Sequence, residues 1–404
     1  MSTSLLYHAF GVRGYKFVSH TFKDGEVFFT VQMNRKNLCC SVCASKNIIL
    51  RGSNTRQFRT VPIGSQPAYI RLDIPRIGCL QCGAVRQAHV PFSQSRRSYT
   101  NSFERHVIEL SRVMTIQDIG LHLNVSWDIV KDIQKRSLQK KYRRIRLCGL
   151  RQIAIDEIAI GRGHKYLTVV LDLCSGAVVF IGDGKGADAL KPFWKRLKRA
   201  RAKIQAVAMD MSPAYISAVQ NNLPKAAIVF DHFHVVKLYN DKLSQLRRDM
   251  YREATELMHK KVIKGTRWLL LKNPENLDNK KNESQRLQEA LKINQPLATA
   301  YYMKEDLRTA WEQPNKKAAR RFLLDWVYRA ESSGIRMLMK FAKTIVVHLE
   351  GLLNYYDYRI STAPLEGTNT KIRVLQRKAY GFRDTEFFKF KIYALHEASF
   401  KLVG

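Results

Sequence analysis

Four cysteines in the N-terminal part of the chain have the types and spacing of a metal site. Cys40 and Cys43 form one C-x-x-C pair, and Cys79 and Cys82 form another. Four thiolates can surround one Zn²⁺ ion tetrahedrally and leave no position open for a substrate, so we expect one structural zinc ion. Cys39 could take the place of Cys40. The alternative is a set of unconnected buried cysteines, which the paired spacing disfavours.

Two aspartates in the middle of the chain could hold a different kind of metal. Asp156 lies within the apolar segment QIAIDEIAI, and Asp210 ends the apolar segment AVAMD. Carboxylates among apolar residues are costly to desolvate and repel each other unless a cation joins them. Mg²⁺ or Mn²⁺ prefers such ligands, and two ions about 3.5–4 Å apart can clamp the attacking and leaving oxygens of a phosphodiester. A third ligand from a later helix is needed. The alternative is that both aspartates face solvent at strand ends.

The segments around these aspartates predict an α/β sheet that would bring them together. Strands are expected at 152–160, 165–173, 177–184, 206–210 and 226–233, and helices at 187–203, 213–222 and 235–250. Three antiparallel strands followed by strands joined through helices is the order of the ribonuclease-H-like fold. In that topology the first and fourth strands are neighbours, so Asp156 and Asp210 would converge.

Residues 115–136 predict a helix-turn-helix. Two helical apolar patterns are separated by a tight turn at Leu123 and Asn124, and Ser126 can cap the second helix. That second helix would enter a major groove. The basic cluster at 140–146, KKYRRIR, suits phosphate contacts. The alternative is an ordinary helical hairpin followed by a solvated linker.

The remaining segments are expected to support these sites. Between the two cysteine pairs, residues 57–62 and 68–75 predict two strands with Gly64 and Pro67 in the turn. Residues 237–355 show no strand pattern and predict amphipathic helices, inserted before the last helix of the catalytic unit.

Single aromatic side chains in the helical stretch are expected to be structural. Trp268, Trp311 and Trp326 should lie in the core, although one could stack on an unpaired base. His259 and His348 should pack or face solvent rather than bind a metal.

The charge of the chain indicates its partner. The sequence has 69 Lys and Arg against 34 Asp and Glu, a net charge of +35, which indicates a polyanion and favours nucleic acid. An anionic membrane surface is a weaker candidate, because no apolar run reaches the roughly 18 residues that span a bilayer. With no export signal, we expect a cytoplasmic, nucleoid-associated protein, whose thiols serve metal binding rather than disulfides.

Five segments together resemble one family, the bacterial insertion-sequence transposases of the ISL3 family, whose catalytic domain is of the DDE class. In chain order they are CCSVC…CLQCG, NVSWDIV, IAIDEIAIGRGHKYLTVVLD, MDMSPAYISAVQNNLPKAAIVFDHFHVVK and APLEGTNTKIRVLQRKAYGF. The likeness covers nearly the whole chain, and its most specific blocks are DHFH and EGTNTKI.

The resemblance implies roles residue by residue. Asp156, Asp210 and Glu366 would form the metal-binding triad. Asp231 and His234 match a D-x-x-H pattern in which the histidine lies near the scissile phosphate. The role of Asp231 itself stays open.

Residues next to the triad complete the comparison with the family. Glu157 is the second acid of the family's DE block, and its role stays open. Pro364 predicts a helix start, which places Glu366 in the first helical turn. This chain departs from the family in having His232 where Arg is expected. It also has Ser-Thr-Ala at 361–363 in place of Ser-Asn-Ala or Ser-Asn-Gly, which could alter the entry into that helix.

Polar and basic residues of the helix-turn-helix, of the basic cluster and of the segment behind Glu366 are the candidate DNA contacts. They are Ser126, Trp127, Lys131, Lys140, Lys141, Arg143, Arg144, Lys371, Arg373, Arg377 and Lys378.

The expected organisation is multidomain. A zinc-binding module at 1–95 and a helix-turn-helix domain with a basic linker at 96–148 precede a ribonuclease-H-like core. That core would comprise 149–240 and 356–404, with an all-helical insertion at 241–355.

The expected activity is that of a transposase. The enzyme would bind terminal inverted repeats and cut and join double-stranded DNA with two Mg²⁺ or Mn²⁺ ions, as a homodimer or larger complex and without a membrane. The alternatives are a catalytically inactive DNA-binding regulator on the same scaffold and a structure-selective nuclease.

Overall fold

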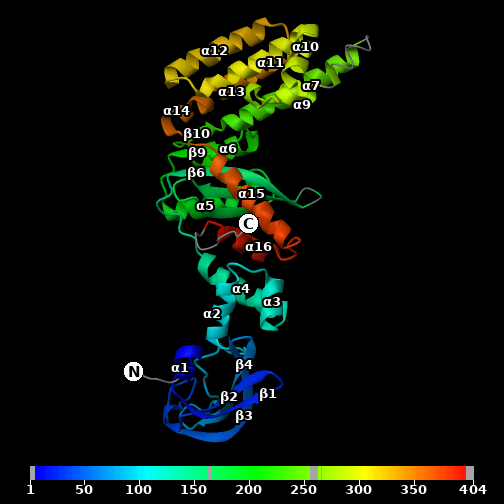
Figure 1. The fold of residues 1–404 in the computed structure, drawn as a ribbon. Coiled ribbons are helices and arrows are strands. Elements are labelled where there is room, and N and C mark those ends of the chain that lie inside the picture. Colours follow the sequence, from blue (N-terminus) through cyan, green and yellow to red (C-terminus); the bar gives the residue numbers. More distant parts are fainter. Residues whose placement is uncertain (1–4, 162, 164, 255–262, 265, 397–404) are drawn as a thin grey trace. The chain divides into compact units, whose positions relative to one another are not determined.

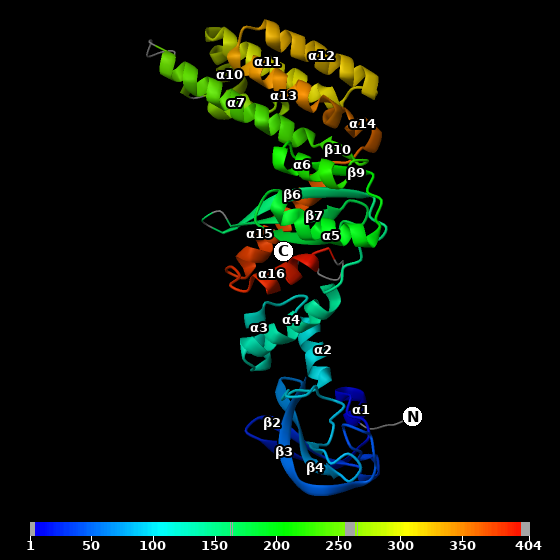
Figure 2. The ribbon, with the colours of Figure 1, turned by 180° about the vertical axis from the view of Figure 1, so that it is seen from behind.

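The computed structural model describes residues 5–161, 163, 165–254, 263, 264 and 266–396 (Figure 1, Figure 2). These residues belong to two compact units, which are described separately. The terminal unit runs to Arg144 and resumes at Gln376, and the central unit is Ile145–Leu375.

The terminal unit begins with a short helix and a sheet. The helix is α1 (Leu5–Phe10), and the strands are β1 (Tyr15–Lys23), β2 (Glu26–Met33), β3 (Ile48–Ile63), β4 (Gln66–Cys79) and β5 (Val85–Gln87). The order is β1-β2-β4-β3, with β5 pairing β4, and only β2 and β4 run parallel. One face buries an apolar core that includes Phe10, Phe29 and Ile70.

The hairpin predicted between the cysteine pairs is confirmed, but its strands are longer than expected. Its turn is at Gly64 and Ser65, where Gly64 has a φ of +59°. The placement of Pro67 in the turn is wrong, because Pro67 belongs to β4. Strands β1 and β2 were not predicted at all. Nearly every residue of β1 is exposed, so that strand lacks the alternation by which one-sided strands are found.

The predicted helix-turn-helix is confirmed within a group of three helices. These are α2 (Asn101–Leu110), α3 (Ile116–Leu123) and α4 (Trp127–Tyr142). Asn124 ends α3 in a left-handed conformation, and the Ser126 hydroxyl caps α4 by accepting from the Asp128 amide. Gly120 in α3 allows the turn to pass close to the helix, because a Cβ there would lie 3.1 Å from the Val125 carbonyl oxygen. The basic cluster is not all linker, since α4 continues through its first three residues.

The C-terminal helix α16 (Thr385–Tyr393) packs against α4 within the terminal unit. Lys135 Nζ lies 3.0 Å from a carboxylate oxygen of Asp384 and 2.7 Å from one of Glu386. The rings of Tyr142 and Tyr393 stack with centroids 6.1 Å apart. The second helix of the helix-turn-helix therefore has an acidic partner from the end of the chain.

The central unit is built on a second sheet. Its strands are β6 (Gln152–Gly161), β7 (Lys165–Asp172), β8 (Val178–Asp183), β9 (Ala206–Met209) and β10 (Ala227–Phe230), in the order β10-β9-β6-β7-β8. The first three strands are antiparallel, and β9 runs parallel to both β6 and β10. The prediction that the first and fourth strands are neighbours is confirmed. The predicted end of the fifth strand is wrong, because Asp231 caps a helix that starts at His232.

Helices surround this sheet and extend beyond it. They are α5 (Lys191–Ala200), α6 (Pro213–Asn222), α7 (His232–Glu253), α9 (Arg267–Leu271), α10 (Glu283–Ile293), α11 (Gln295–Arg308), α12 (Lys316–Ser332), α13 (Arg336–Leu353), α14 (Tyr355–Tyr358) and α15 (Ala363–Lys378). In Figure 1 α15 crosses in front of the sheet, and in Figure 2, from behind, α5 and α6 are in front. Between 237 and 355 the described residues contain no strand, as predicted.

The sheet and the helices share one apolar core. Phe230 at the end of β10, Tyr239 in α7 and Phe341 in α13 belong to the same buried cluster. The prediction for Trp326 is confirmed, since it is fully buried and donates its ring N–H to the Met303 carbonyl. Trp311 is partly buried, whereas the prediction for Trp268 is wrong, because that side chain is 66% exposed.

The two histidines of the helical stretch have different outcomes. The ring of His348 packs on that of Phe230 with centroids 5.0 Å apart, and burial lowers its pKa, which confirms a packing role. His259 lies outside the described residues.

A glycine joins the helices to the sheet and gives a test of this packing. A Cβ on Gly351 in α13 would lie 2.3 Å from the Phe230 ring. Gly351→Ala should therefore destabilise the protein by about 1–3 kcal/mol in urea unfolding, because a packed core cannot absorb the added methyl group without shifting. A Cβ on Gly367 in α15 would meet nothing within 4 Å. Gly367→Ala should be neutral or stabilise by up to about 1 kcal/mol, and equal effects of the two changes would contradict this packing.

Candidate functional site

Asp156 and Asp210 come from neighbouring parallel strands. Asp156 lies in β6 two residues after Ala154, which pairs with Ala208 of β9, and Asp210 directly follows β9. Asp210 accepts a hydrogen bond from the Ser212 amide, 3.0 Å from Oδ1. Burial raises the pKa of Asp156, and the negative charges of Asp210 and Glu157 act in the same direction. Asp210 is thus close enough to influence the charge of Asp156.

Helix α15 is tied to the strand that carries Asp156. Asn369 donates from Nδ2 to Asp156 Oδ2 at 2.8 Å. Glu366 lies three residues earlier in the first turn of the same helix, as Pro364 predicts. Residues three apart share one face of a helix. The hydrogen bond from Asn369 therefore places the segment with Glu366 beside β6.

A second tie joins the start of α15 to the start of α7. The Asp231 carboxylate is 1% exposed and accepts from the Phe233 amide at 2.8 Å. Its other oxygen accepts from the Thr362 amide at 2.6 Å and from the Thr362 hydroxyl. On α7, His234 Nε2 lies 3.7 Å from Glu366 Oε1. Thr362 is the residue at 361–363 where this chain differs from the pattern expected for the family. Its hydroxyl donates a hydrogen bond to Asp231.

Two buried polar atoms in this region have no hydrogen-bond partner among the described residues. They are His234 Nε2 and Asn369 Oδ1. With a partly buried aspartate of raised pKa nearby, they fit a region that receives a cation with its water or a substrate oxygen. The carboxylates do not form a closed cage, since the one group of three or more potential metal ligands in the described chain is the cysteine cluster. An open set of oxygen ligands suits Mg²⁺, which keeps several waters.

Glu157 has a different environment from Asp156. Successive residues of a strand point to opposite faces, and Glu157 Oε2 accepts from the Tyr215 hydroxyl of α6 at 3.0 Å. Burial raises the pKa of Tyr215 to about 12, so this hydroxyl stays protonated and donates. The hydroxyl oxygen of Tyr215 also accepts a hydrogen bond from the Gly186 amide at 3.1 Å. Glu157 therefore connects the sheet to α6, on the face away from α15.

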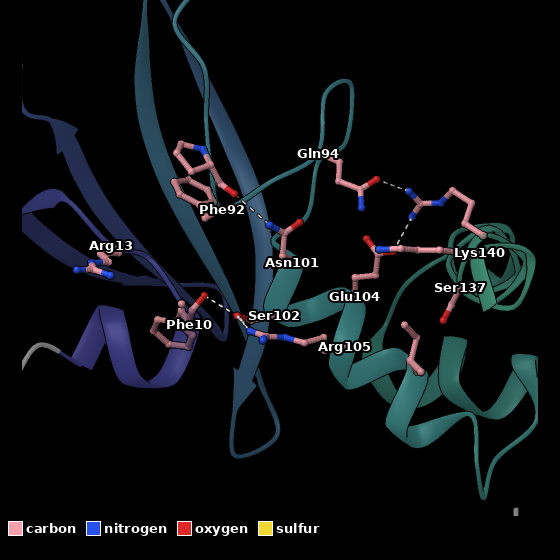
Figure 3. Close-up of a pocket in the computed structure, with 14 residues that line it drawn as sticks. Phe10, Arg13, Phe92, Gln94, Asn101, Ser102, Glu104, Arg105, Ser137 and Lys140 are labelled. Carbon is pink, nitrogen blue, oxygen red and sulfur yellow. Dashed lines mark hydrogen bonds and ion pairs between the residues drawn. The ribbon is translucent and has the colours of Figure 1, made fainter. Parts of the chain in front are cut away.

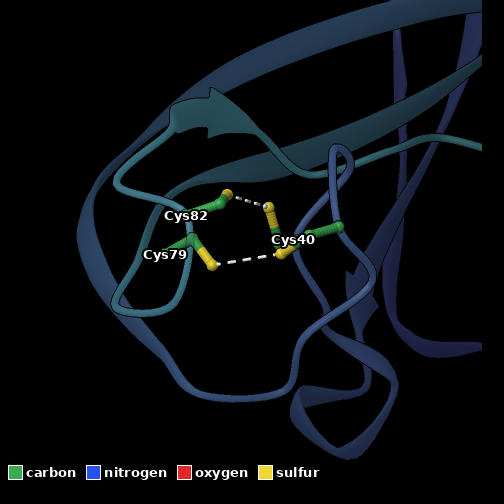
Figure 4. A group of neighbouring side chains, drawn as sticks. Cys40, Cys79 and Cys82 are labelled. Carbon is green, nitrogen blue, oxygen red and sulfur yellow. Dashed lines mark hydrogen bonds between the residues drawn. The ribbon is translucent and has the colours of Figure 1, made fainter.

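The four predicted zinc ligands lie together in the terminal unit. The sulfur atoms of Cys40, Cys43, Cys79 and Cys82 are all within 4.8 Å of one another (Figure 4). The backbone amide of Cys82 is the largest influence that lowers the pKa of Cys79, to about 6. Cys39 is exposed and outside the cluster, whereas Cys40 belongs to it, which favours Cys40 as the ligand. These four thiols fit one tetrahedral Zn²⁺.

The candidate DNA contacts occupy several surfaces. Trp127 at the start of α4 is 55% exposed, and Ser126 is used as a cap. Lys131 lies 3.4 Å from Asp384, so within the terminal unit its charge is already paired. The other basic candidates are exposed at the end of α4 or along α15, and they are Lys140, Lys141, Arg143, Arg144, Lys371, Arg373, Arg377 and Lys378.

Several residues that support the candidate site were not predicted from the sequence. Asn369 was detectable, because it lies one helical turn after Glu366 in the EGTNTKI block. Thr362 was noticed only as a departure. Tyr215 and the acidic pair Asp384 and Glu386 gave no local signal, since their partners are far away in the sequence.

The cysteine cluster predicts a defined metal content. The purified protein should contain about one Zn²⁺ per chain by elemental analysis, and replacing Cys79 and Cys82 together by Ser should remove it. Cys39→Ser is the matched control and should keep the zinc. Zinc retained in the double variant would contradict this site.

Comparisons with known proteins agree with this arrangement. Residues 36–82 match a zinc-finger model of the transposases IS204/IS1001/IS1096/IS1165, and residues 88–138 match the helix-turn-helix domain of transposase family ISL3. Residues 153–392, more than half of the chain, match the transposase (DDE) model of the same family. No helix among the described residues is long and apolar enough to cross a membrane.

Two curated relatives are similar over most of their length. The transposase for insertion sequence element IS1001 of Bordetella parapertussis is 32% identical over 369 residues, 89% of each chain. The transposase for insertion sequence element IS1557 of Mycobacterium tuberculosis is 29% identical over 360 residues, 83% of this chain and 80% of the relative. The chain therefore belongs to the ISL3 family of insertion-sequence transposases.

Proposed function

We propose that this protein binds the terminal inverted repeats of an insertion sequence and catalyses DNA cleavage and strand transfer. Asp156, Asp210 and Glu366 are the metal-binding residues in this proposal. The observation that carries it is the hydrogen bond from Asn369 to Asp156. It joins the helix of Glu366 to strand β6, whose neighbour β9 leads into Asp210.

The topology of the central unit supports a ribonuclease-H-like core for this chemistry. Three antiparallel strands are followed by two parallel strands, and helices connect β8, β9 and β10. Helices then occupy the chain between α7 and α15, which supports a helical insertion ahead of Glu366. The sheet brings together residues that are distant in the sequence, as a site built from strand ends and a late helix needs.

The reaction in this proposal has two displacements at phosphorus. Water attacks the phosphodiester at the end of the element, the bond to the 3′ oxygen breaks, and a 3′-OH is released. That 3′-OH then attacks a phosphodiester of the target, forms the new bond and releases a target 3′-OH. Two divalent ions, when bound, supply the Lewis acid that activates the attacking oxygen and stabilises the leaving one.

The residues of the chain orient the reacting groups. Asp156, Asp210 and Glu366 supply the oxygen ligands. His234 Nε2, which has no hydrogen-bond partner among the described residues, is available to hydrogen-bond a phosphate oxygen beside Glu366. The exposed cations of α15 and of the end of α4 hold the DNA backbone without reading its sequence. Because two ends must be cut together, the acting form is a dimer or a larger assembly.

The activity has a direct test in one substitution. With terminal-repeat duplex and Mg²⁺ or Mn²⁺, wild type should cut at the ends of the element. Asp210→Asn should bind the same duplex within about twofold and leave it whole, because only a metal ligand is lost. Gel analysis of the DNA measures cutting, and fluorescence anisotropy measures binding.

Two outcomes of this experiment would contradict the proposal. Normal DNA cutting by the Asp210→Asn variant would show that the proposed metal-binding residues are wrong. Tight binding without cutting by the wild type would favour the alternative of an inactive DNA-binding regulator.

The tie between Asp231 and Thr362 gives a second test. Thr362→Val keeps the shape of the side chain but removes a donor to a buried carboxylate, which should cost about 1.5–3 kcal/mol in urea unfolding. It should also slow cutting at least tenfold, since the start of the Glu366 helix loses its anchor. Thr362→Ser keeps the hydroxyl and should cut at nearly the wild-type rate. Equal DNA-cutting rates for the Thr362→Val and Thr362→Ser variants would show that this hydrogen bond does not position Glu366.

A further inference from the structure

A cleft of about 680 Å³ lies between the zinc module and the helix-turn-helix of the terminal unit. One wall is formed by the end of α1 and the residues after it, and the other by α2 and α4, with a loop at 91–94 between them (Figure 3). Arg13 stands on the first wall, and Lys140 on the second. Neither the acidic residues of the central unit nor the cysteine cluster takes part in this cleft.

Hydrogen bonds between the two modules hold the cleft in shape. The Ser102 hydroxyl at the start of α2 donates to the Phe10 carbonyl at 2.7 Å, and both residues are buried. Gly11 allows this close approach, because a Cβ there would lie 2.9 Å from Ser102 Oγ. A second hydrogen bond between the modules runs from the buried Arg59 of β3, which donates to the Leu123 carbonyl at the end of α3 at 2.8 Å. The walls are therefore set by the fold before any ligand binds.

The charge of the cleft is strongly positive. Arg136 is compensated, since it lies 3.4 Å from both Glu104 and Asp132. In the described part of the chain, no carboxylate lies within ion-pair distance of Arg13, Arg105 or Lys140. The carboxylate in the lining is that of Glu104, which is paired with Arg136. The three remaining cations are therefore complementary to an anion.

The lining distinguishes between anionic ligands. A free nucleotide would need a surface on which its base could stack, but Phe10 and Phe92 are only 2% and 4% exposed. Lys140 lies in the last turn of α4, the second helix of the helix-turn-helix, which enters a major groove in the proposed function. A duplex bound by α4 would therefore have its backbone close to this cleft.

We propose that this cleft binds the sugar-phosphate backbone of DNA beside the segment that α4 reads, with Arg13, Arg105 and Lys140 contacting phosphates. The inference rests on the proposed function, since it requires that the helix-turn-helix binds DNA. In this proposal the DNA backbone lies in the cleft between the zinc module and the helix-turn-helix. Both modules then bind one continuous stretch of duplex.

The first test places a charge in the cleft. Ser137 of α4 lines it and is half-buried. Ser137→Glu should weaken binding to both a terminal-repeat duplex and a shuffled duplex at least tenfold at 100 mM salt, because its carboxylate repels phosphates. Ser137→Gln has nearly the same size without the charge and should bind within twofold of wild type. The measurement is anisotropy with the full-length, zinc-loaded protein and no Mg²⁺ or Mn²⁺.

The second test counts phosphate contacts. Removing Arg13 and Arg105 together by Ala should lower the slope of log K against log salt by about 2, since each contact contributes about 0.9. The matched control is Lys23→Ala with Arg112→Ala, which removes two exposed charges outside the cleft and should keep the slope.

Three results would overturn the inference. They are equal weakening by Ser137→Glu and Ser137→Gln, an unchanged slope in the double arginine variant, and ATP binding that Ser137→Glu abolishes while DNA binding persists. Failure of the proposed function would appear instead as absence of cutting. The shuffled duplex separates the two, because backbone binding needs neither cutting nor sequence reading.

Discussion

A carboxylate that is partly buried in a sheet has to be compensated, and the arrangement of the central unit follows from that constraint at Asp156. Burial raises its pKa, and the charges of Asp210 and Glu157 add to the cost of ionising it. Within the protein, compensation comes from the Glu157 amide, from the Asn369 side chain and from the nearby His234, which acts to lower the pKa of Asp156. These groups only partly offset the cost of burying the charge, since the pKa of Asp156 is still raised. The remaining demand for positive charge is the physical reason to expect a cation at this point of the fold.

The same hydrogen bond from Asn369 connects local and distant parts of the chain. It spans 213 residues and brings the first turn of α15 to strand β6. Asp231 makes a comparable connection to Thr362 over 131 residues. Between them, the two contacts fix the start of the helix that carries Glu366 relative to β6 and α7. The start of α15 is therefore held beside β6 although the described chain between β10 and α15 contains several long helices.

Patterns within one element were sufficient to predict much of this fold. The apolar runs of β6 and β9, the cap at Ser126 and the two cysteine pairs each act locally, and each prediction is confirmed by the strands, the helix start and the sulfur cluster. The fifth strand was extended too far because the capping role of Asp231 was overlooked, although aspartate is a preferred N-cap. Trp268 was misplaced because α9 has only five residues, too few for a helical period to show which side is buried.

Other features could not be predicted because their causes are distant in the sequence. The partner of Asp156 depends on how α15 meets the sheet, and the pairing of Lys131 with Asp384 depends on how α16 meets α4. Strand β1 is exposed along nearly its whole length, so no periodic pattern marks it. The cationic cleft likewise arises from side chains of α2, α4 and the segment after α1, which are adjacent only after folding.

The central claim is that Asp156, Asp210 and Glu366 bind divalent ions, and metal-directed cleavage of the polypeptide tests it without relying on enzyme activity. Fe²⁺ can take the place of Mg²⁺ among oxygen ligands and, with ascorbate and peroxide, cuts the chain close to where it is bound. The zinc-loaded protein should be cut near residues 156, 210 and 366. Mg²⁺ should suppress all three cuts together, and Asp210→Asn should abolish them. Cuts at none of these positions, or an unchanged pattern in Asp210→Asn, would contradict the account.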